Sequence, residues 1–235
     1  MPQARAELLT VVVPVHNEAK TVRTALERLL KADLPTPLEV IVVDDGSTDG
    51  SPEVVSELVR SDAVRLIRHP RNRGKGAAVR TGIEQAEGDI ITVFDADLEY
   101  RPEDYRSVLE PVLSGETNVA YGTRSFGGHT SFSFWYVLGN RFVSFWASFL
   151  YNTWLSDVET CIKIATADTW RSLDLRENGF GFDAETTAKV LRRGERIFEV
   201  PVSYRARRRQ DGKQLRWTDG VAAVWILLRV RLFGR

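Results

Sequence analysis

Several common features are missing from this sequence of 235 residues, and each absence narrows the range of functions. Cys161 is the only cysteine, so no disulfide can form within the chain, and a reducing compartment is the simpler expectation. Lysine plus arginine and aspartate plus glutamate both number 32, so the chain has no net charge to attract nucleic acid. We therefore expect no nucleic-acid partner.

Long apolar segments are missing as well. The first residues lack the apolar core of a signal peptide. Residues 132–155 are long enough to cross a bilayer but contain Arg141, two asparagines and several serines, and the apolar run 221–230 is too short. Any membrane contact is therefore expected to be peripheral.

Two glycine motifs that bind nucleotide phosphates are also absent. No G-x-G-x-x-G follows the first apolar run, and G-x-x-x-x-G-K-[ST] occurs nowhere in the chain. These absences argue against a dinucleotide-dependent oxidoreductase and a P-loop NTPase. They favour a fold that holds diphosphate through a metal ion.

What the sequence does contain is a regular alternation of apolar strands and amphipathic helices. With 43% hydrophobic residues the chain can bury a sizeable core, and we expect a single domain over residues 1–235. The predicted strands are 8–13, 38–43, 64–67, 90–94 and 118–122, with helical patterns between them. This order predicts an α/β fold whose mostly parallel sheet has right-handed crossovers and is flanked by helices.

The fourth predicted strand ends abruptly in acidic residues. Asp95 and Asp97 are two positions apart on an extended backbone, so both carboxylates can point to one place. Such oxygen ligands suit Mg²⁺ or Mn²⁺, which proteins usually bind through one or two carboxylates together with substrate phosphates. The alternative is capping of the next helix, but Glu103 and Asp104 already occupy its first turn. We therefore predict a metal site and a nucleoside diphosphate derivative as substrate.

Polar segments also follow the first two predicted strands. They are residues 14–18 and residues 44–49. Because ligands in parallel α/β sheets bind at the carboxyl ends of the strands, we expect both segments to share one edge with Asp95 and Asp97.

Five short motifs occur in a specific order along the chain. They are Val13 to Glu18, Val42 to Asp49, Asn72 to Gly76, Asp95 to Leu98 and Gly122 to Arg124. This succession resembles the inverting family 2 glycosyltransferases, and it is most similar to the dolichyl-phosphate or polyprenyl-phosphate mannose and glucose synthases. The resemblance runs from about Leu8 to Gly220 and implies a GT-A type fold.

The resemblance implies which residues bind the nucleotide-sugar donor. They are Pro14, His16, Glu18, Val43, Asp45, Lys75, Asp95, Ala96, Asp97 and Arg124. His16 stands where the family often has Tyr, and an imidazole can still stack on a base. By the same resemblance, Asp97 and Glu99, together with Asp95, are expected to hold Mg²⁺ or Mn²⁺. Arg124 is expected to face the phosphates, to which a planar guanidinium is well suited.

For the acceptor, the resemblance points to two later segments. Residues 156–163 resemble the family's Asp-x-x-Cys/Ser-Gly-Phe-Lys segment, so Lys163 is expected at the site. Residues 200–213 resemble its acceptor loop, whose Arg and Lys six positions apart are Arg207 and Lys213 here. Asp183 has two open interpretations, the N-cap of its helix or an acid that faces the acceptor. These four residues are the predicted acceptor-phosphate site.

Residues 132–155 are dense in aromatic side chains at helical spacing. Trp135, Phe142 and Trp146 lie on the apolar stripe, and such a stripe is often a core helix. Trp and Tyr also favour the bilayer boundary, and residues 192–235 carry 12 basic and 4 acidic residues that would attract anionic lipid. We expect this segment, with the basic loop and C-terminal amphipathic helix of residues 204–235, to lie at a membrane interface.

These features together predict a metal-dependent, inverting glycosyltransferase. It would move a hexose from UDP-glucose or GDP-mannose to a dolichyl or polyprenyl phosphate, in the cytoplasm and peripherally on the inner face of the membrane. Asp97, Arg124, Arg207 and Lys213 are expected to carry the reaction, by stabilising the leaving diphosphate and positioning the acceptor phosphate.

Two alternatives remain open. The first is a family relative that acts on a sugar hydroxyl with Asp183 as the base. The second is a nucleotide-sugar-binding subunit without turnover that is recruited to a membrane. A membrane subunit or a second copy of the chain is also left open as a partner.

Overall fold

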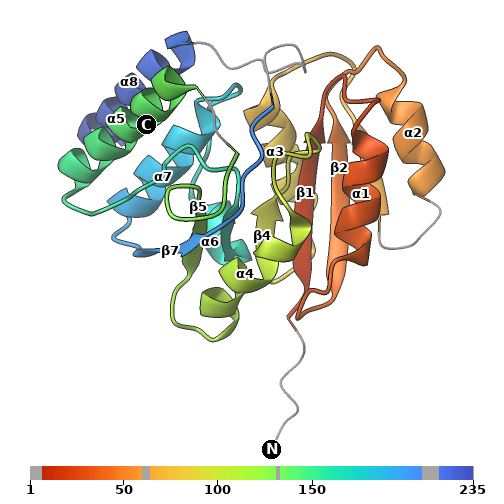
Figure 1. The fold of residues 1–235 in the computed structure, drawn as a ribbon, viewed down its shortest axis with the longest axis horizontal. Helices are drawn as coiled ribbons and strands as arrows, with labels where there is room; N and C mark the ends of the chain where they lie inside the picture. Colours follow the sequence, from red (N-terminus) through yellow and green to blue (C-terminus); the bar gives the residue numbers. More distant parts are fainter. Residues whose placement is uncertain (1–6, 60–63, 131–132, 208–216, 235) are drawn as a thin grey trace, which may run out of the picture.

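The computed structural model describes residues 7–59, 64–130, 133–207 and 217–234, which form a seven-stranded sheet flanked by helices (Figure 1). The strands are β1 (Leu9–Val15), β2 (Leu38–Asp44), β3 (Val64–Arg68), β4 (Ile90–Val93), β5 (Val119–Thr123), β6 (Lys163–Thr166) and β7 (Ile197–Pro201). The helices are α1 (Val22–Lys31), α2 (Ser51–Leu58), α3 (Lys75–Gln85), α4 (Tyr105–Leu113), α5 (Phe134–Tyr151), α6 (Ala167–Ser172), α7 (Phe182–Arg192) and α8 (Trp217–Phe233), with a 3₁₀ turn, η1 (Pro102–Asp104), before α4.

The strand order is β3-β2-β1-β4-β6-β5-β7. β3, β2, β1 and β4 are parallel, as the alternation of strands and helices predicts, and β5 is parallel to β7. β7 was not predicted from the sequence, and neither was β6. β6 lies between β4 and β5 and is antiparallel to both. With four residues and a polar residue at each end, it has too short an apolar run for a sequence pattern to show.

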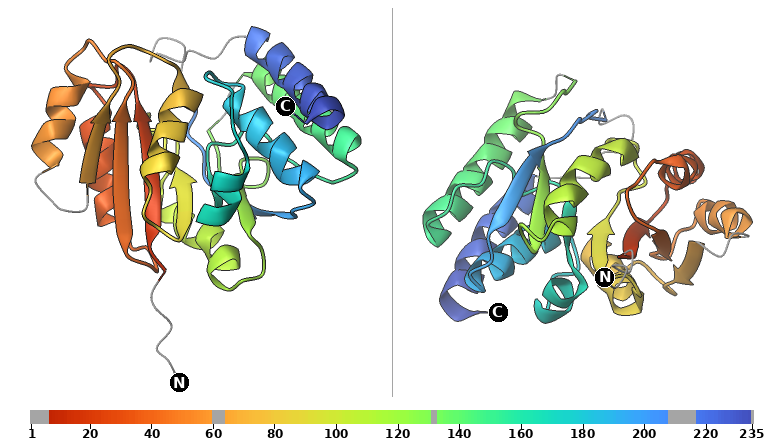
Figure 2. Two further views of the ribbon diagram at one scale, coloured as in Figure 1. Left: turned by 180° about the vertical axis from the view of Figure 1, so that it is seen from behind. Right: turned by 90° about the horizontal axis from the view of Figure 1, so that it is seen from below.

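The central strands are buried because helices cover both faces of the sheet (Figure 2). Val11, Val12, Val40 and Ile41 are fully buried, which explains why their strands read as continuous apolar runs rather than as alternating ones. α3 packs very closely on β1. A Cβ added at Gly82 would lie 2.3 Å from Val12 Cγ1, so a larger residue there would push the helix off the sheet.

A second, smaller core joins α5, α7 and α8 at one end of the molecule (Figure 1). Its buried residues are Val143, Ala147, Leu155, Val158, Ala184, Ala188, Ala223, Ile226, Leu227 and Val230. Trp146 is half-buried against this core, and its Nε1–H donates to the Val224 carbonyl oxygen at 3.2 Å. The predicted aromatic helix and C-terminal helix are thus confirmed as α5 and α8, and they pack on each other.

Candidate functional site at the carboxyl edge of the sheet

The carboxyl ends of β1, β2 and β4 lie at one edge of the sheet. Hydrogen bonds tie the loop after β1 to the turn after β2. The Asn17 backbone N–H donates to Ser47 Oγ (3.0 Å), and Asn17 Oδ1 accepts from the Thr48 N–H (2.9 Å). The Glu18 N–H donates to Ser51 Oγ at 2.9 Å. The two segments form one continuous rim beside the acidic end of β4, with Pro14 at its start.

The predicted donor residues of β2 lie beneath this rim. The Asp45 carboxylate is buried and accepts hydrogen bonds from His69 Nδ1 (2.7 Å) and from the backbone N–H groups of residues 73 (3.0 Å) and 74 (2.7 Å). Val43 is fully buried. The Asp45 carboxylate therefore holds the loop between β3 and α3, and donor binding by this residue stays a prediction. His16 lies on the rim, with Nδ1 2.9 Å from the Asp45 carbonyl oxygen.

Asp95 and Asp97 follow β4 as predicted but have different partners. Lys75 Nζ lies 2.8 Å from Asp95 Oδ2, and although burial opposes its ionisation, the charge of Lys75 lowers the pKa of Asp95. Asp97 Oδ1 accepts from the Glu99 N–H at 3.0 Å, so it also makes the turn contact that sequence reasoning had set aside. Burial, with the charges of Asp95 and Glu99, raises the pKa of Asp97 to about 7.

The segment after β7 lies directly on these acids. The Tyr204 hydroxyl donates to Glu99 Oε2 (2.5 Å), and the Arg207 backbone N–H donates to Glu99 Oε1 (2.7 Å). The Arg207 guanidinium lies 3.3 Å from both Glu18 and Asp97. Glu99 thus fastens the segment predicted to bind the acceptor to the acidic turn, and Arg207 brings a positive charge between two acids that follow different strands.

The predicted three-carboxylate metal cluster is not assembled in this arrangement. Within the part of the chain that the structure describes, no group of three or more His, Cys, Asp or Glu side chains is placed to hold a metal ion. Glu99 uses its carboxylate on residues 204 and 207. Asp97 and Glu18 instead share the Arg207 guanidinium. The chemistry of these oxygen donors fits a divalent cation.

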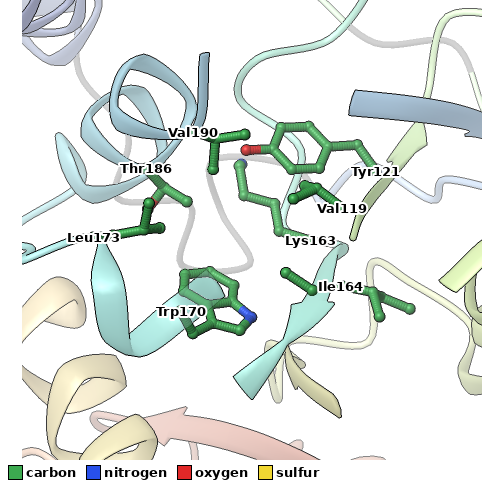
Figure 3. Close-up of a pocket in the computed structure, with 9 residues that line it drawn as sticks. Val119, Tyr121, Lys163, Ile164, Trp170, Leu173, Thr186 and Val190 are labelled. Carbon is green, nitrogen blue, oxygen red and sulfur yellow. The ribbon is translucent and has the colours of Figure 1, made fainter. Parts of the chain in front are cut away.

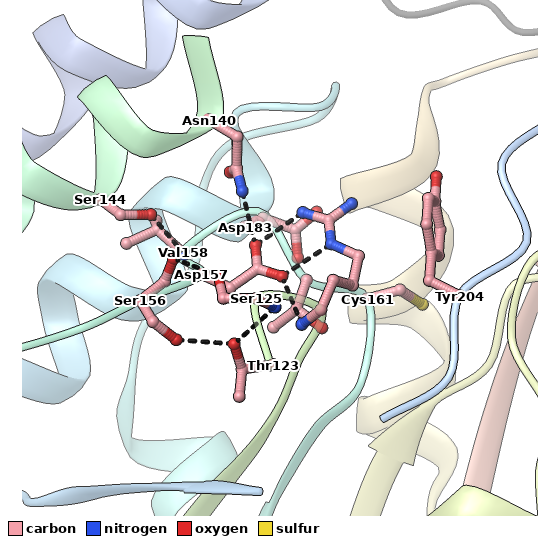
Figure 4. Close-up of polar contacts among 12 residues, drawn as sticks. Thr123, Ser125, Asn140, Ser144, Ser156, Asp157, Val158, Cys161, Asp183 and Tyr204 are labelled. Carbon is pink, nitrogen blue, oxygen red and sulfur yellow. Dashed lines mark hydrogen bonds and ion pairs between the residues drawn. The ribbon is translucent and has the colours of Figure 1, made fainter. Parts of the chain in front are cut away.

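Arg124 lies immediately after β5 and is held by the buried carboxylate of Asp157, which is labelled in Figure 4. Its Nε and Nη2 donate to the two oxygens of Asp157 at 2.7 and 2.6 Å, and its backbone N–H donates at 3.0 Å. Its guanidinium carbon lies 5.1 Å from the centre of the Tyr204 ring. Tyr204 therefore contacts both Arg124, over its ring, and Glu99 of the acidic turn, through its hydroxyl.

Lys163 does not face an open site, which corrects the acceptor prediction. It is 1% exposed, and its Nζ donates to Asp183 Oδ1 (2.7 Å) and to the carbonyl oxygens of residues 158 and 160. Figure 3 shows its side chain between Tyr121 and α7, in closed packing that has no room for a ligand.

Asp183 is likewise not an N-cap. Gly181 takes that position, and Asp183 lies in the first turn of α7. Its second carboxylate oxygen lies 3.9 Å from Lys75 Nζ. Asp183 therefore links the buried Lys163 to the lysine that contacts Asp95.

Of the remaining predicted residues, Ala96 is buried next to the acids, and Lys213 lies outside the described residues. Sequence reasoning missed three side chains of this site, Asp157, Tyr204 and Glu159. Asp157 and Tyr204 were in segments already noted for resemblance, but their partners Arg124 and Glu99 are distant in sequence, so no local pattern could pair them. Burial, with the nearby charge of Asp183, raises the pKa of Glu159 to about 7.

The outer face of α5 and α8 carries large exposed apolar side chains. They are Phe134, Trp135, Leu138, Phe142, Phe145 and Phe149 on α5, and Val221, Trp225, Leu232 and Phe233 on α8. Trp135 is 75% exposed, so the core-helix interpretation is wrong for this face, although Trp146 does belong to the core. None of the helices described is both long and apolar enough to cross a membrane.

The fold places the protein among α/β proteins of the GT-A type. Glucosyl-3-phosphoglycerate synthase from Mycobacterium tuberculosis, solved with Mn²⁺, UDP and glucosyl-3-phosphoglycerate, superposes with a TM-score of 0.75 at 20% identity, over 96% of this chain and 80% of that chain. A mannosyltransferase from Pyrobaculum calidifontis, solved with GDP-Man and Mn²⁺, has a TM-score of 0.62 at 23% identity, over 87% of this chain and 58% of that chain.

Sequence comparison then defines the family. The family model "Glycosyl transferase family 2" matches residues 10–166, and the chain belongs to this family of glycosyltransferases. It is 29% identical to an undecaprenyl-phosphate mannosyltransferase from Micrococcus luteus, over 94% of this chain and 97% of that protein. It is 33% identical to a dolichol-phosphate mannosyltransferase from Pyrococcus furiosus, over 49% of this chain and 33% of that protein.

Proposed function

We propose that this glycosyltransferase moves a hexose from a nucleotide sugar to a polyprenyl phosphate with inversion of the sugar. The observation that carries the proposal is the position of Arg207, 3.3 Å from Glu18 and Asp97, because it brings the predicted acceptor segment into contact with the predicted donor site. The two relatives named for undecaprenyl-phosphate and dolichol-phosphate mannosyl transfer support this acceptor class.

The residues that would hold a divalent metal are Asp97 with Asp95, and Glu99 only if it gives up a present partner. Mg²⁺ or Mn²⁺ bound there would neutralise charge on the donor diphosphate. Arg124, which Asp157 holds next to the Tyr204 ring, would contribute positive charge to the leaving diphosphate. Arg207, and Lys213 by resemblance, would receive the acceptor phosphate and reduce its repulsion from the donor phosphates.

The geometry favours a phosphate acceptor over a hydroxyl acceptor. A hydroxyl must lose a proton during attack, so it needs a positioned base, whereas a phosphate monoester with a second pKa of about 6 is mostly a dianion at neutral pH. The predicted base, Asp183, directs its two oxygens to Lys163 and Lys75. A binding subunit without turnover is disfavoured by the same site, since the acids and both arginines are present together.

A membrane surface is the second partner that we propose. The exposed aromatic face of α5 and α8 suits the bilayer boundary, and a lipid-linked acceptor requires the protein to work there. We therefore propose that the protein works peripherally on the inner, cytoplasmic face of the membrane.

The test is transfer from a panel of sugar nucleotides, including UDP-glucose and GDP-mannose, to undecaprenyl phosphate with Mg²⁺ or Mn²⁺. The lipid-linked hexose product is detected by mass spectrometry. Asp97→Asn and added EDTA are the controls that should remove the product. Product formed only on free sugars or glycoside hydroxyls, with none on the lipid phosphate, would overturn the proposed acceptor.

A further inference from the structure

Asp157 is a fully buried carboxylate that collects four hydrogen bonds (Figure 4). Three come from the Nε, Nη2 and backbone N–H of Arg124, and the fourth comes from Asn140 Nδ2 at 3.0 Å. Although burial opposes its ionisation, the charge and hydrogen bonds of Arg124 lower the pKa of Asp157 below its ordinary value. The ionised Asp157 carboxylate thus holds the Arg124 guanidinium along its Nε edge.

The turn that carries Asp157 is fixed from three elements. Glu199 of β7 accepts from the backbone N–H of Ser156 (3.0 Å) and of Asp157 (3.2 Å). Thr123 of β5 lies with its hydroxyl 2.6 Å from Ser156 Oγ. Ser144 of α5 accepts from the N–H of residue 158 at 3.1 Å. These contacts hold the backbone of residues 156–158, from which the Asp157 side chain extends, whereas the carboxylate itself is held only by Arg124 and Asn140.

This arrangement determines how Arg124 can meet a ligand. With Nε and Nη2 bound by Asp157, the guanidinium plane is set, and the Tyr204 ring lies against it at 5.1 Å. An arginine that is already ordered loses less side-chain entropy when it binds a phosphate, and its aim is preserved during the reaction.

We infer that Asp157 and Asn140 are positioning residues that set the orientation of Arg124 towards phosphate. Asn140 is the less obvious of the two, because it belongs to α5, the helix whose outer face is exposed and aromatic. Its amide donates the fourth hydrogen bond to the Asp157 carboxylate. The orientation of Arg124 therefore depends on the position of α5. The role in phosphate binding rests on the proposed function.

The test compares Asn140→Ala with a matched control in the same helix, Ser144→Ala. Both variants remove one contact from α5 to the turn of residues 156–158, but only the first touches the Asp157 carboxylate. We expect Asn140→Ala to lower kcat about tenfold with the donor KM within about twofold, the size of one hydrogen bond to a charged group. Ser144→Ala should lower thermal stability and leave kcat of the folded enzyme within about twofold.

A third variant, Asn140→Asp, adds a pH signature that a purely structural role would not show. Protonated, the new carboxyl can donate to Asp157 as the amide does. Ionised, it repels Asp157 across a hydrogen-bond distance. Its activity relative to the wild type should therefore recover as the pH falls from 8 to 6, while the ratio for Asn140→Ala stays constant.

A second measurement does not require the enzyme to turn over its substrates. The Arg124 Nε–H should give a slowly exchanging NMR signal in the wild type, assigned by its loss in Arg124→Lys, and Asn140→Ala should broaden or shift it. An unchanged signal, or equal kinetic losses in Asn140→Ala and Ser144→Ala, would overturn the inference. Failure of the proposed acceptor instead appears as absence of lipid product from the wild type with the NMR result intact.

Discussion

Arg207 is the residue at which the donor and acceptor parts of the proposed site meet. Its guanidinium contacts Glu18 and Asp97, and its backbone N–H is held by Glu99. A divalent cation bound at Asp97 would have to share this space with a positive side chain. Under the proposed function the arginine would have two alternative roles, as a counterion to the acids when no cation is bound and as a ligand for the acceptor phosphate when one is.

The first prediction concerns this competition. Arg207→Gln should raise the affinity for Mn²⁺ in the presence of a nucleoside diphosphate by at least about tenfold, because a like charge leaves the site. The same variant should lower lipid transfer. The free Mn²⁺ signal in electron paramagnetic resonance measures the affinity. The control is Arg205→Gln, two residues away with an exposed side chain, which should change the affinity by no more than about twofold. Equal affinities in wild type and Arg207→Gln would contradict the prediction.

A second prediction separates stability from chemistry at Asp183. Asp183→Asn leaves the buried ammonium of Lys163 without its charged partner, which should cost about 3 to 5 kcal/mol in the free energy of unfolding. Transfer per folded molecule should fall less than it does in Arg207→Ala. Urea unfolding measures the first quantity, and initial rates corrected for folded fraction measure the second. If Asp183→Asn were stable but inactive, a base-dependent hydroxyl acceptor would be the better interpretation.

At the scale of the elements, α5 and α8 combine two surfaces in one pair of helices. Their inner sides form the small core with α7, and their outer sides carry exposed aromatics. Sequence periodicity alone could not say which aromatics belong to which side, because Trp135, Phe142 and Trp146 share one stripe. The structure separates them, since Trp146 donates its indole N–H to Val224 while Trp135 is exposed.

The third prediction follows from this separation. Replacing Trp135, Phe142 and Phe149 together by Ser should weaken binding to phosphatidylcholine–phosphatidylglycerol vesicles at least about tenfold, with little change in Tm. Trp146→Ser is the matched core control and should lower Tm clearly. Vesicle flotation and thermal unfolding of the same samples decide between them. Undiminished flotation of the triple variant would show that another surface binds the membrane.

At the scale of the whole molecule, the sheet brings together segments that are far apart in the sequence. Glu18 follows β1, Asp97 follows β4, Arg124 follows β5 and Arg207 follows β7. Insertion of antiparallel β6 between β4 and β5 separates the acidic turn from Arg124, and Tyr204 fills the space between them.

The fourth prediction is that the stability of the whole molecule depends on pH through Glu159. Glu159 Oε1 is buried and accepts no hydrogen bond from any described residue, and the pKa of the group is raised from 4.5 to about 7. Because the pKa of Glu159 is higher in the folded than in the unfolded protein, the folded state binds its proton more tightly. The free energy of unfolding is therefore highest below about pH 4.5 and falls as the pH rises to about 7. Glu159→Gln cannot ionise, so it should be more stable than the wild type at pH 8 by up to about 3 kcal/mol.

The measurement is Tm of both proteins between pH 5 and pH 8, with Glu84→Gln, at an exposed position, as the control. The gain of Glu159→Gln over the wild type should be small at pH 5 and grow through this window. A gain that is constant with pH would mean that the side chain is not desolvated in the folded protein.

The sequence by itself determined the parallel half of the sheet, the acidic end of β4, both amphipathic helices and the glycosyltransferase family. These follow from local patterns, because apolar runs, helical stripes and short motifs act over a few neighbouring residues. The motif order also indicated Arg124 and Arg207, though not what each contacts.

Tertiary structure alone decided which polar residues turn inwards and which stay at the site. Asp45, Lys163 and Asp183 look like site residues in the sequence, yet their charged groups are used up by a loop or by one another. Asp157 and Glu99 acquire their roles from partners 33 and 108 residues away. A buried charged group needs a partner, and the fold can bring that partner from any distance along the chain. The sequence around a residue therefore does not show which partner it has.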